Sequence, residues 1–426
     1  MSVGETLVVS SPSEKIRNGD ASYPFRQSSD VFYLSGCSEP ETTIVLKKTK
    51  DGNKSIAFVR PKNKEKEIWD GRRLGVEGAI SVLGFDEAYP SHELGKRLAK
   101  SLSGSTRLYA SLGENPLFDK RILKAIADCR QGKRRGLEPI VDVSDPLFNL
   151  HEMRLIKSED EIDLLKKASQ ISAQAHVMAM QHAKPGVFEY ELSALLDFEF
   201  ARRGCSGPGY QSIVGAGENA TILHYIENTS ELKEGELILI DAGGEYDFYT
   251  ADITRTFPVS GKFSAPQKAA YQVVLRAQKE AIALVKPGVT LEQIHTQVVK
   301  HLTEGMIELG LLKGTVEERI ADKTYRRFYM HKTSHWLGMD VHDVGLYHEN
   351  GDARPLQPGM VITIEPGLYV GLEEEGIPSE FKGMGIRIED DVLVTEGGFE
   401  VLTHEVPKEI NEIEDLCRSN CNNLLS

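Results

Sequence analysis

The sequence predicts an α/β protein of two domains, the second of which contains an internal duplication. Three observations lead to this fold class. At 426 residues the chain is longer than most single domains. Short apolar runs rich in β-branched residues alternate with segments of helical apolar spacing. A long helix, the motif Lys-Pro-Gly-Val and a second helix occur together twice in the second part of the chain.

Composition narrows the class of protein. Hydrophobic residues make up 40% and charged residues 27%, which is ordinary for a soluble globular chain. A net charge of −14 without a basic cluster argues against nucleic acid as a partner. The N-terminus lacks a signal pattern, and no apolar run approaches the ~20 residues that span a bilayer, so we expect no membrane segment. Five scattered cysteines without a Cys-x-x-Cys pair favour reduced thiols and a cytoplasmic location.

Residues 1–156 are expected to form the first domain, an α/β module. Its stretch Asp20–Gly36 mixes aromatic and charged residues, including Asp30, and is either an interface or a strand of the domain's own sheet. Trp69, beside charges and a turn, is similarly a rim residue or a packed corner. The strands and helices expected here are Thr43–Leu46, Ser55–Val59, Glu93–Leu102 and Lys120–Cys129.

Residues 157–415 are expected to form the second domain, and 416–426 a frayed tail. Ser158 and Glu161 form a capping box before a helix that runs to about His182. The motif at 184–187 follows, and then a helix from Glu189 to Arg203.

The second copy of this pattern begins at Ser264. A helix is expected from there to about Val285, followed by the motif at 286–289 and a helix from Leu291 to about Leu309. The repeat predicts two pseudo-symmetric halves with a ligand site between them.

Leu237–Pro258 is the most informative stretch of the first half. Its buried run ends on Asp241, the pair Gly243-Gly244 is expected to form a turn, and a second extended segment carries Asp252. The two carboxylates can face each other across this hairpin and hold a cation. Alternatively, both aspartates cap turns.

The second half contributes three segments dense in polar side chains. Phe328–Gly345 carries His331, His335 and His342, and Val361–Gly367 is an apolar run that ends in Glu365. In Gly385–Val392 we expect one strand, with Arg387 and Glu389 on the same face.

Four strand-end acids from the two halves, with His335, predict a metal centre. Buried carboxylates that converge without cations repel one another strongly at neutral pH. Oxygen-rich ligands suit Mn²⁺ or another divalent first-row metal better than a structural Zn²⁺. Two such ions ~3.5–4 Å apart can bridge a water, generate hydroxide and polarise a carbonyl.

At these residues the sequence resembles the aminopeptidase P (Xaa-Pro aminopeptidase) family of pita-bread metallopeptidases. The likeness covers nearly the whole chain and includes SYPFRQSSDVFYLSG, EIWDGRRLG, HEMRLIKS, GAGENATILHY, DAGGEYDFYTADITRTFP, HKTSHWLGMDVHDVG, TIEPGLY and GIRIEDDV. It implies a creatinase-like N-terminal domain and a pita-bread catalytic domain with a pseudo-two-fold axis. It also implies a homodimer or homotetramer. The helix that commonly opens the family's first domain is short or missing here.

The resemblance also implies a role for each residue of the centre. Asp252 and Glu389 would bridge two metal ions, Asp241 would hold one ion, and His335 and Glu365 the other. The ions would be Mn²⁺, with Co²⁺, Zn²⁺ or Fe²⁺ as alternatives. Glu365 would also act as general base. The resemblance implies that His224 and His342 bind the substrate and donate hydrogen bonds to the oxyanion. It implies that Arg387 and His331 are supporting catalytic residues. It also implies substrate-binding residues near the cleft, namely Tyr210, Arg154 and Tyr369.

The expected activity is release of the N-terminal residue from peptides with proline second. A peptide bond to proline has no N–H, and a site built from two metals and histidines does not need that donor. One alternative is a prolidase, which cuts Xaa-Pro dipeptides with the same centre and needs a cation such as Arg354 for the free carboxylate. Another is a metal-free creatinase-like hydrolase or a peptide-binding module, but such relatives have lost acidic ligands that this chain retains.

Overall fold

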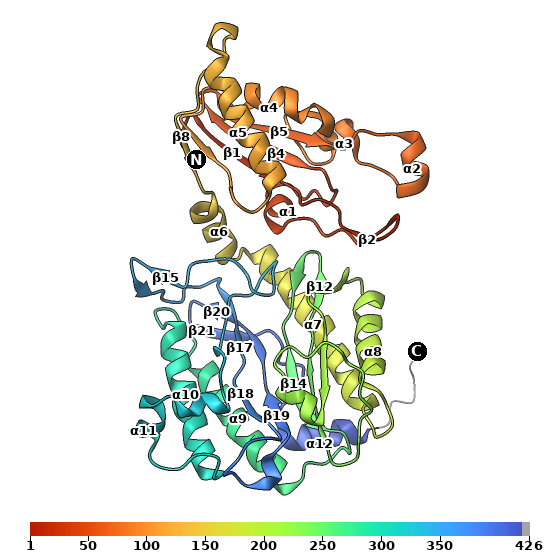
Figure 1. The fold of residues 1–426 in the computed structure, drawn as a ribbon, viewed down its shortest axis with the longest axis vertical. Helices are drawn as coiled ribbons and strands as arrows, with labels where there is room; N and C mark the ends of the chain where they lie inside the picture. The colour runs from red at the N-terminus through yellow and green to blue at the C-terminus, as the bar shows by residue number, and fades with distance from the viewer. Residues whose placement is uncertain (420–426) are drawn as a thin grey trace. The chain divides into compact units, whose positions relative to one another are not determined.

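The computed structural model describes residues 1–419, except for the side chain of Leu147. The chain divides into two compact units, Met1–His151 and the part from Glu152 onward (Figure 1). Helix α6 (Leu147–Leu155) contains the point of division. Among the described residues, no helix is both long enough and apolar enough to cross a membrane.

The first unit is built on a six-stranded sheet in the order β6-β5-β4-β1-β7-β8. Alternate residues of its central strands point to opposite faces, so Val8 and Val45 belong to one hydrophobic cluster while Val9 and Ile44 belong to another. The strands are β1 (Glu5–Ser10), β4 (Thr43–Thr49), β5 (Gly52–Val59), β6 (Glu87–Pro90), β7 (Arg107–Tyr109) and β8 (Asp142–Ser144). The helices are α1 (Ser29–Ser35), α2 (Lys64–Asp70), α3 (Gly75–Ser81), α4 (Leu94–Leu102) and α5 (Pro116–Gln131).

The aromatic stretch of this unit is not a strand of the sheet. Residues 29–35 form helix α1, whose Val31 is fully buried, and a two-stranded ribbon of β2 (Ile16–Asn18) and β3 (Ala21–Ser22) precedes it. Val31 and Leu34, three positions apart, face the same hydrophobic cluster, which suits one face of a helix. The first element of the unit is strand β1, with no helix before it.

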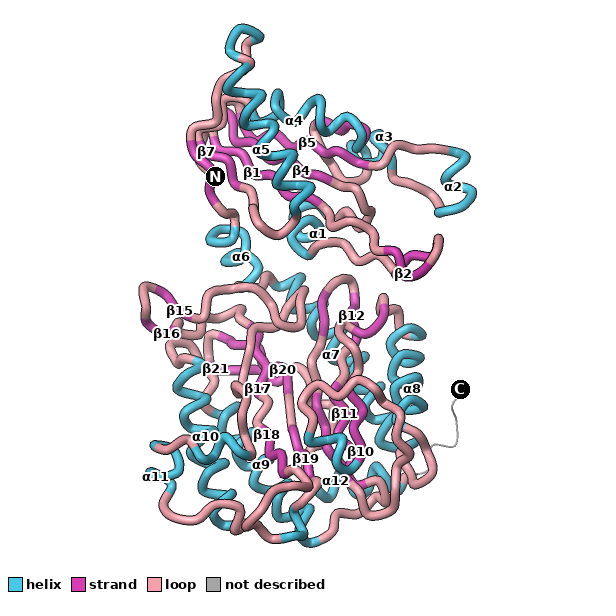
Figure 2. Tube along the Cα trace, in the orientation of Figure 1, coloured by secondary structure: helices cyan, strands magenta, loops and turns pink. Residues whose placement is uncertain are grey.

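The second unit places two helix pairs on either side of its strands (Figure 2). The pairs are α7 (Glu159–His182) with α8 (Glu189–Arg202), and α9 (Ala265–Ala283) with α10 (Leu291–Glu308). The capping box at Ser158 and Glu161 opens α7, and Ser264 caps α9 in the same manner. Two shorter helices are α11 (Val316–Ala321) and α12 (Ile410–Arg418).

The duplication is visible in the backbone hydrogen bonds of the two linkers. The Gly186 N–H donates to Leu232 O at 3.0 Å, and the Leu232 N–H donates to Val187 O at 2.8 Å. The equivalent bonds in the second half join Gly288 to Leu356 at 2.9 Å and Leu356 to Val289 at 2.7 Å. Both glycines have φ near +90°, which a residue with a Cβ rarely adopts.

Each half contains a three-stranded antiparallel sheet, β10-β11-β14 in the first and β17-β20-β21 in the second. Sheets β13-β12-β9 and β18-β19 lie beside them, and a short hairpin joins β15 to β16. The strands of the first half are β9 (Gly207–Pro208), β10 (Ile213–Ala216), β11 (Leu237–Asp241), β12 (Gly244–Tyr246), β13 (Tyr249–Thr250) and β14 (Thr254–Pro258). Those of the second are β15 (His348–Glu349), β16 (Asp352–Ala353), β17 (Val361–Ile364), β18 (Gly367–Val370), β19 (Met384–Arg387), β20 (Asp390–Thr395) and β21 (Gly398–Val401).

Two predicted local structures in this unit are wrong. The turn of the first-half hairpin lies at Asp247 and Phe248, both with positive φ, and not at the glycine pair. A Cβ on Gly243 would lie 1.8 Å from Ala251 O, so this glycine permits close backbone approach. The stretch Gly385–Val392 is not one strand, because β19 pairs with β18 and β20 pairs with β17.

The predicted tail also begins too early. Leu416 and Cys417 belong to helix α12 and pack against the main hydrophobic cluster, together with the buried Ile410 and Ile413 of the same helix. Their spacing along the helix places them on one apolar face. Cys421 lies outside the described residues.

Candidate metal centre

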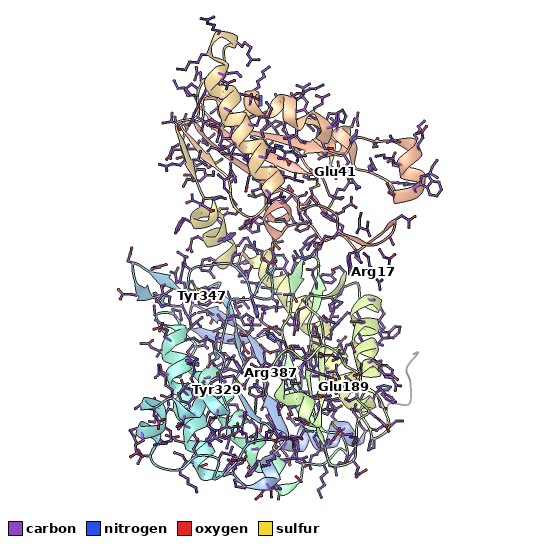
Figure 3. The ribbon with its side chains drawn as sticks, in the orientation of Figure 1. Arg17, Glu41, Glu189, Tyr329, Tyr347 and Arg387 are labelled. Carbon is purple, nitrogen blue, oxygen red and sulfur yellow. The ribbon has the colours of Figure 1, made fainter. Side chains whose placement is uncertain are left out.

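A cavity of about 450 Å³ in the second unit collects most of the polar residues that the sequence singled out. It is lined by the described side chains of Asp241, Asp252, His335, Glu365 and Glu389, by those of Tyr210, His224, His331, His342 and Arg387, and by Gln211, Ile213, Leu223, Ile226, Lys332, Ser334 and Val341. Figure 3 shows Arg387 between the strands of the two halves.

The four acids reach this cavity from the ends of strands in both halves. Asp241 is the last residue of β11, and Asp252 lies between β13 and β14. Glu365 directly follows β17, and Glu389 directly precedes β20. The β11–β14 register pairs Asp241 with Thr254, which places Asp252 just beyond the paired residues.

Two of these acids and His335 place possible metal-ligand atoms close together. Asp252, His335 and Glu389 each offer one atom, and those atoms all lie within 4.8 Å of one another. His335 Nε2 is 3.4 Å from Asp252 Oδ2 and 3.6 Å from Glu365 Oε1. The His335 ring is fixed from its other side, because its Nδ1 contacts Trp336 O at 3.0 Å.

Asp241 joins the group through Tyr210 and Arg387. The Tyr210 hydroxyl is 2.6 Å from Asp241 Oδ1 and 2.5 Å from Asp252 Oδ1. A phenol carries one hydrogen, so it can satisfy only one of these two carboxylates at a time. Arg387 Nη2 donates to the other oxygen of Asp241 at 2.6 Å.

The electrostatics of the group favour a bound cation. Burial and then the charges of Asp252 and Glu365 raise the pKa of Glu389 well above its usual value. Burial raises the pKa of Glu365 to about 7 as well. Burial lowers the pKa of His335, but its contact with Asp252 and the charge of Glu365 outweigh this and raise it to about 9. The donor set of four carboxylates and an imidazole therefore fits divalent ions.

The three other histidines of the sequence motifs also line the cavity. The ring centroid of His342 is 4.4 Å from that of His335, at an interplanar angle of 76°. His331 Nε2 is 2.9 Å from the Tyr369 hydroxyl. Burial and the neighbouring Arg387 lower the pKa of His331 to about 4, so its ring is neutral at pH 7. His224 lies on the same cavity wall as Leu223 and Ile226.

Arg154 and Tyr369 do not line the cavity but lie behind residues that do. Arg154 donates to Asp340 at 2.7 Å and to Asp343 at 2.6 Å, and so fixes the loop that carries His342. Lys157 contacts the other oxygen of Asp343 at 2.9 Å. The Tyr369 hydroxyl also accepts a hydrogen bond from Arg387 Nη1 at 3.0 Å.

Sequence reasoning missed residues whose importance depends on contacts distant in the chain. The buried carboxylate of Glu189 accepts hydrogen bonds from the Ala216 and Ser230 N–H groups at 2.8 Å each and from the Tyr225 hydroxyl at 2.9 Å. It thereby fixes the segment that carries His224. In the sequence Glu189 is an ordinary acid in the first turn of a helix, so no signal identified it. Figure 3 shows it on helix α8.

Arg354, the proposed carboxylate-binding cation of a prolidase, is already engaged. Its Nη1 and Nη2 donate to the two oxygens of Glu152 at 2.6 and 2.5 Å, and its Nε lies 3.2 Å from Glu349. It lines a different, neighbouring cavity.

The chain is similar to known protein families, relatives and solved structures over nearly its whole length. Residues 163–396 match metallopeptidase family M24, and residues 1–109 match the N-terminal domain of aminopeptidase P. The Xaa-Pro aminopeptidase of Escherichia coli K12 is 44% identical, over 98% of this chain and 94% of its own. Human Xaa-Pro aminopeptidase 3 is 36% identical, over 97% and 81%. The structure of Zn-substituted E. coli aminopeptidase P in complex with product superposes with a TM-score of 0.96 at 43% identity, covering 99% of this chain and 96% of that one.

Proposed function

The chain belongs to metallopeptidase family M24, and from this premise we propose that it is an Xaa-Pro aminopeptidase, which hydrolyses the bond between the N-terminal residue of a peptide and a following proline. The supporting observation is that the acids of both halves, His335 and the flanking histidines all reach one cavity. Two bacterial Xaa-Pro aminopeptidases, 44% and 45% identical over 98% of this chain, favour the same activity.

Five residues are proposed to hold two divalent ions, which we propose are Mn²⁺: Asp241, Asp252, His335, Glu365 and Glu389. When bound, the ions would supply Lewis acidity to the scissile carbonyl and to the attacking water. Tyr210 and Arg387 orient Asp241, and the Thr254 hydroxyl orients Glu389 through a 2.7 Å hydrogen bond.

The chain's own groups then account for proton transfer and charge stabilisation. Glu365, which lines the cavity beside His335, is proposed to take a proton from water and to return it to the leaving proline nitrogen. His342 and His224 line the cavity, and we propose that they donate hydrogen bonds to the developing oxyanion. His331 contacts the Tyr369 hydroxyl at 2.9 Å and lies 3.6 Å from Glu365, and we propose that it supports catalysis from this position.

A direct test offers Ala-Pro dipeptide and Ala-Pro-Ala tripeptide to the Mn²⁺-loaded protein and follows release of alanine by chromatography. We expect cleavage of the tripeptide with kcat/KM at least tenfold above that for the dipeptide. Cleavage of the dipeptide alone would favour a prolidase instead.

The ligand assignment is tested with Asp252→Asn and Glu389→Gln. Each removes a charged oxygen donor from the centre, so we expect less than half the Mn²⁺ per chain after dialysis and at least a 10³-fold lower kcat. The matched control is Glu396→Gln, an exposed acid of the same unit. Normal metal content and turnover in both variants would refute the assignment.

We also propose that the protein acts in the cytoplasm as a homodimer or homotetramer. On helix α2, Trp69 is 86% exposed and Ile68 is 80% exposed. Apolar side chains this exposed at adjacent positions are typical of an interface. Analytical ultracentrifugation of the protein and of Trp69→Ala measures the assembly. A monomeric wild-type protein would refute this part of the proposal.

A further inference from the structure

A second cavity of about 450 Å³ adjoins the candidate metal centre. The two cavities share the side chains of Lys332, Ser334, His335 and His342. The second is otherwise lined by Thr333, by residues of α10 that include Glu292 and His295, and by the segment after His342, which includes Tyr347 and Arg354. A ligand that begins at the acids can therefore continue past Lys332 into this space.

The basic groups around the two cavities differ in how they are engaged. Arg387 is bonded to Asp241 and Arg354 to Glu152. Burial, followed by the charge of Lys332, lowers the pKa of His295 to about 4, so its ring carries no charge at pH 7. Lys332 is exposed, and within the described part of the chain no carboxylate forms an ion pair with it.

The backbone on both sides of Lys332 is fixed. His331 Nδ1 donates to Lys332 O at 2.7 Å. The Thr333 hydroxyl contacts Tyr329 Oη at 2.7 Å and His295 Nδ1 at 2.8 Å, and the Glu365 N–H donates to Thr333 O at 2.8 Å. These hydrogen bonds fix the segment that carries Lys332, and its side chain lines both cavities.

We propose that Lys332 determines specificity by binding a carboxylate on the part of the peptide that follows proline. This inference rests on the proposed function. The five candidate metal ligands line the first cavity, and Lys332 lines both cavities. Glu292, an acid that lines the second cavity, is 3.0 Å from His348 and is not paired with Lys332. A short peptide with free termini has charges complementary to the acids and to this ammonium. The substrates that this arrangement favours are short peptides whose carboxylate lies just after proline, either at the C-terminus or in an acidic side chain.

The test compares Ala-Pro-Ala as free acid, its C-terminal amide, and Ala-Pro-Asp amide in the Mn²⁺-loaded protein. We expect KM for the free acid to be lower than for the amide by a factor on the order of five, with kcat nearly equal. The acidic side chain of Ala-Pro-Asp amide recovers part of this difference if it reaches Lys332. Lys332→Gln should bring the three KM values together, and Lys332→Glu should make the free acid the poorest substrate.

Lys313→Gln, at another exposed lysine of the same unit, is the matched control and should leave all three KM values unchanged. Equal KM values for acid and amide in the wild type, or a preference that persists in Lys332→Gln, would overturn the inference while leaving the proposed function intact. Cleavage of none of the three peptides by the wild type would overturn the proposed function, and this inference with it.

Discussion

At the scale of single residues, the centre depends on groups that control charge. The Tyr210 hydroxyl and the Arg387 guanidinium both contact Asp241. Burial raises the pKa of Asp241, but the charge of Arg387 and these hydrogen bonds outweigh burial and leave the pKa below its usual value, while the pKa values of the other acids of the site are raised. Adjacent to Asp241, Ala242 O contacts Nε2 of the fully buried His176 at 2.9 Å. A neutral imidazole thus supports the strand end without adding charge.

His176 predicts a dependence of stability on pH. Burial lowers its pKa to about 4 from the ordinary 6.5. The unfolded chain then binds more protons between these values, so the free energy of unfolding falls as the pH falls through this window. Between pH 7 and pH 5 this histidine alone contributes a loss of about 2 kcal/mol.

Urea unfolding of the metal-free wild-type protein and of metal-free His176→Gln, each at pH 7 and pH 5, measures this loss of the free energy of unfolding. The glutamine amide retains a donor for Ala242 O but does not titrate, so the loss of stability between the two pH values should be smaller by about 2 kcal/mol. His404→Gln, at an exposed histidine, is the control. The same pH dependence in His176→Gln as in the wild type would refute the prediction.

At the scale of elements, glycines allow the segments of the centre to cross closely. A Cβ on Gly385 of β19 would lie 2.0 Å from Ala220 O in the segment before His224, and one on Gly243 would lie 1.8 Å from Ala251 O. Both contacts involve backbone atoms, which cannot rotate away. The backbone segments therefore approach at distances that only glycine permits, between the two halves at Gly385 and within the first half at Gly243.

We predict that Gly243→Ala destabilises the protein by at least about 3 kcal/mol, because the backbone at Ala251 must shift to admit the methyl group. Asp252, the next residue, would move with it, so metal affinity should fall in the same variant. Chemical denaturation and metal titration measure the two effects. Gly397→Ala is the control, since a Cβ there meets nothing within 4 Å, and an equal midpoint for the two variants would contradict the prediction.

At the scale of the whole molecule, ligands from both halves make metal binding and folding of the second unit interdependent. Asp241 and Asp252 come from the first half, and His335, Glu365 and Glu389 from the second. Ions bound between them would join the halves and relieve the repulsion among the acids. Any ligand that binds only the folded state stabilises it by mass action.

Removal of metal by chelation is therefore expected to lower the melting temperature, and added Mn²⁺ should restore it. At an ion concentration 100 times the dissociation constant, the stabilisation is about 2.7 kcal/mol per site. Differential scanning fluorimetry measures the shift, with Glu389→Gln as a comparison that should respond less. A melting temperature that is the same with and without chelator would contradict the prediction.

Local patterns were sufficient for much of the fold. The capping box at Ser158, the helix start at Ser264, the repeated linkers and the periodic apolar faces predicted the four long helices of the second unit to within a few residues. They failed at Gly385–Val392, where an unbroken alternation concealed a change of partner strand between Arg387 and Asp390. Strand partners are chosen by contacts distant in the sequence, which no local pattern records.

The sequence by itself determined the helix pairs, the duplication and the kinds of side chain available for a metal centre, because capping, periodicity and chemical type are local properties. Only the tertiary structure decided that Arg154 and Tyr369 lie behind the cavity and that Glu189 fixes the segment bearing His224. It also decided that Arg354 forms an ion pair with Glu152, whereas Lys332 is not paired with an acid of the described chain. Partners such as Glu152 and Arg354 are about 200 residues apart, and whether a charge is compensated depends on which of them the packed elements bring together.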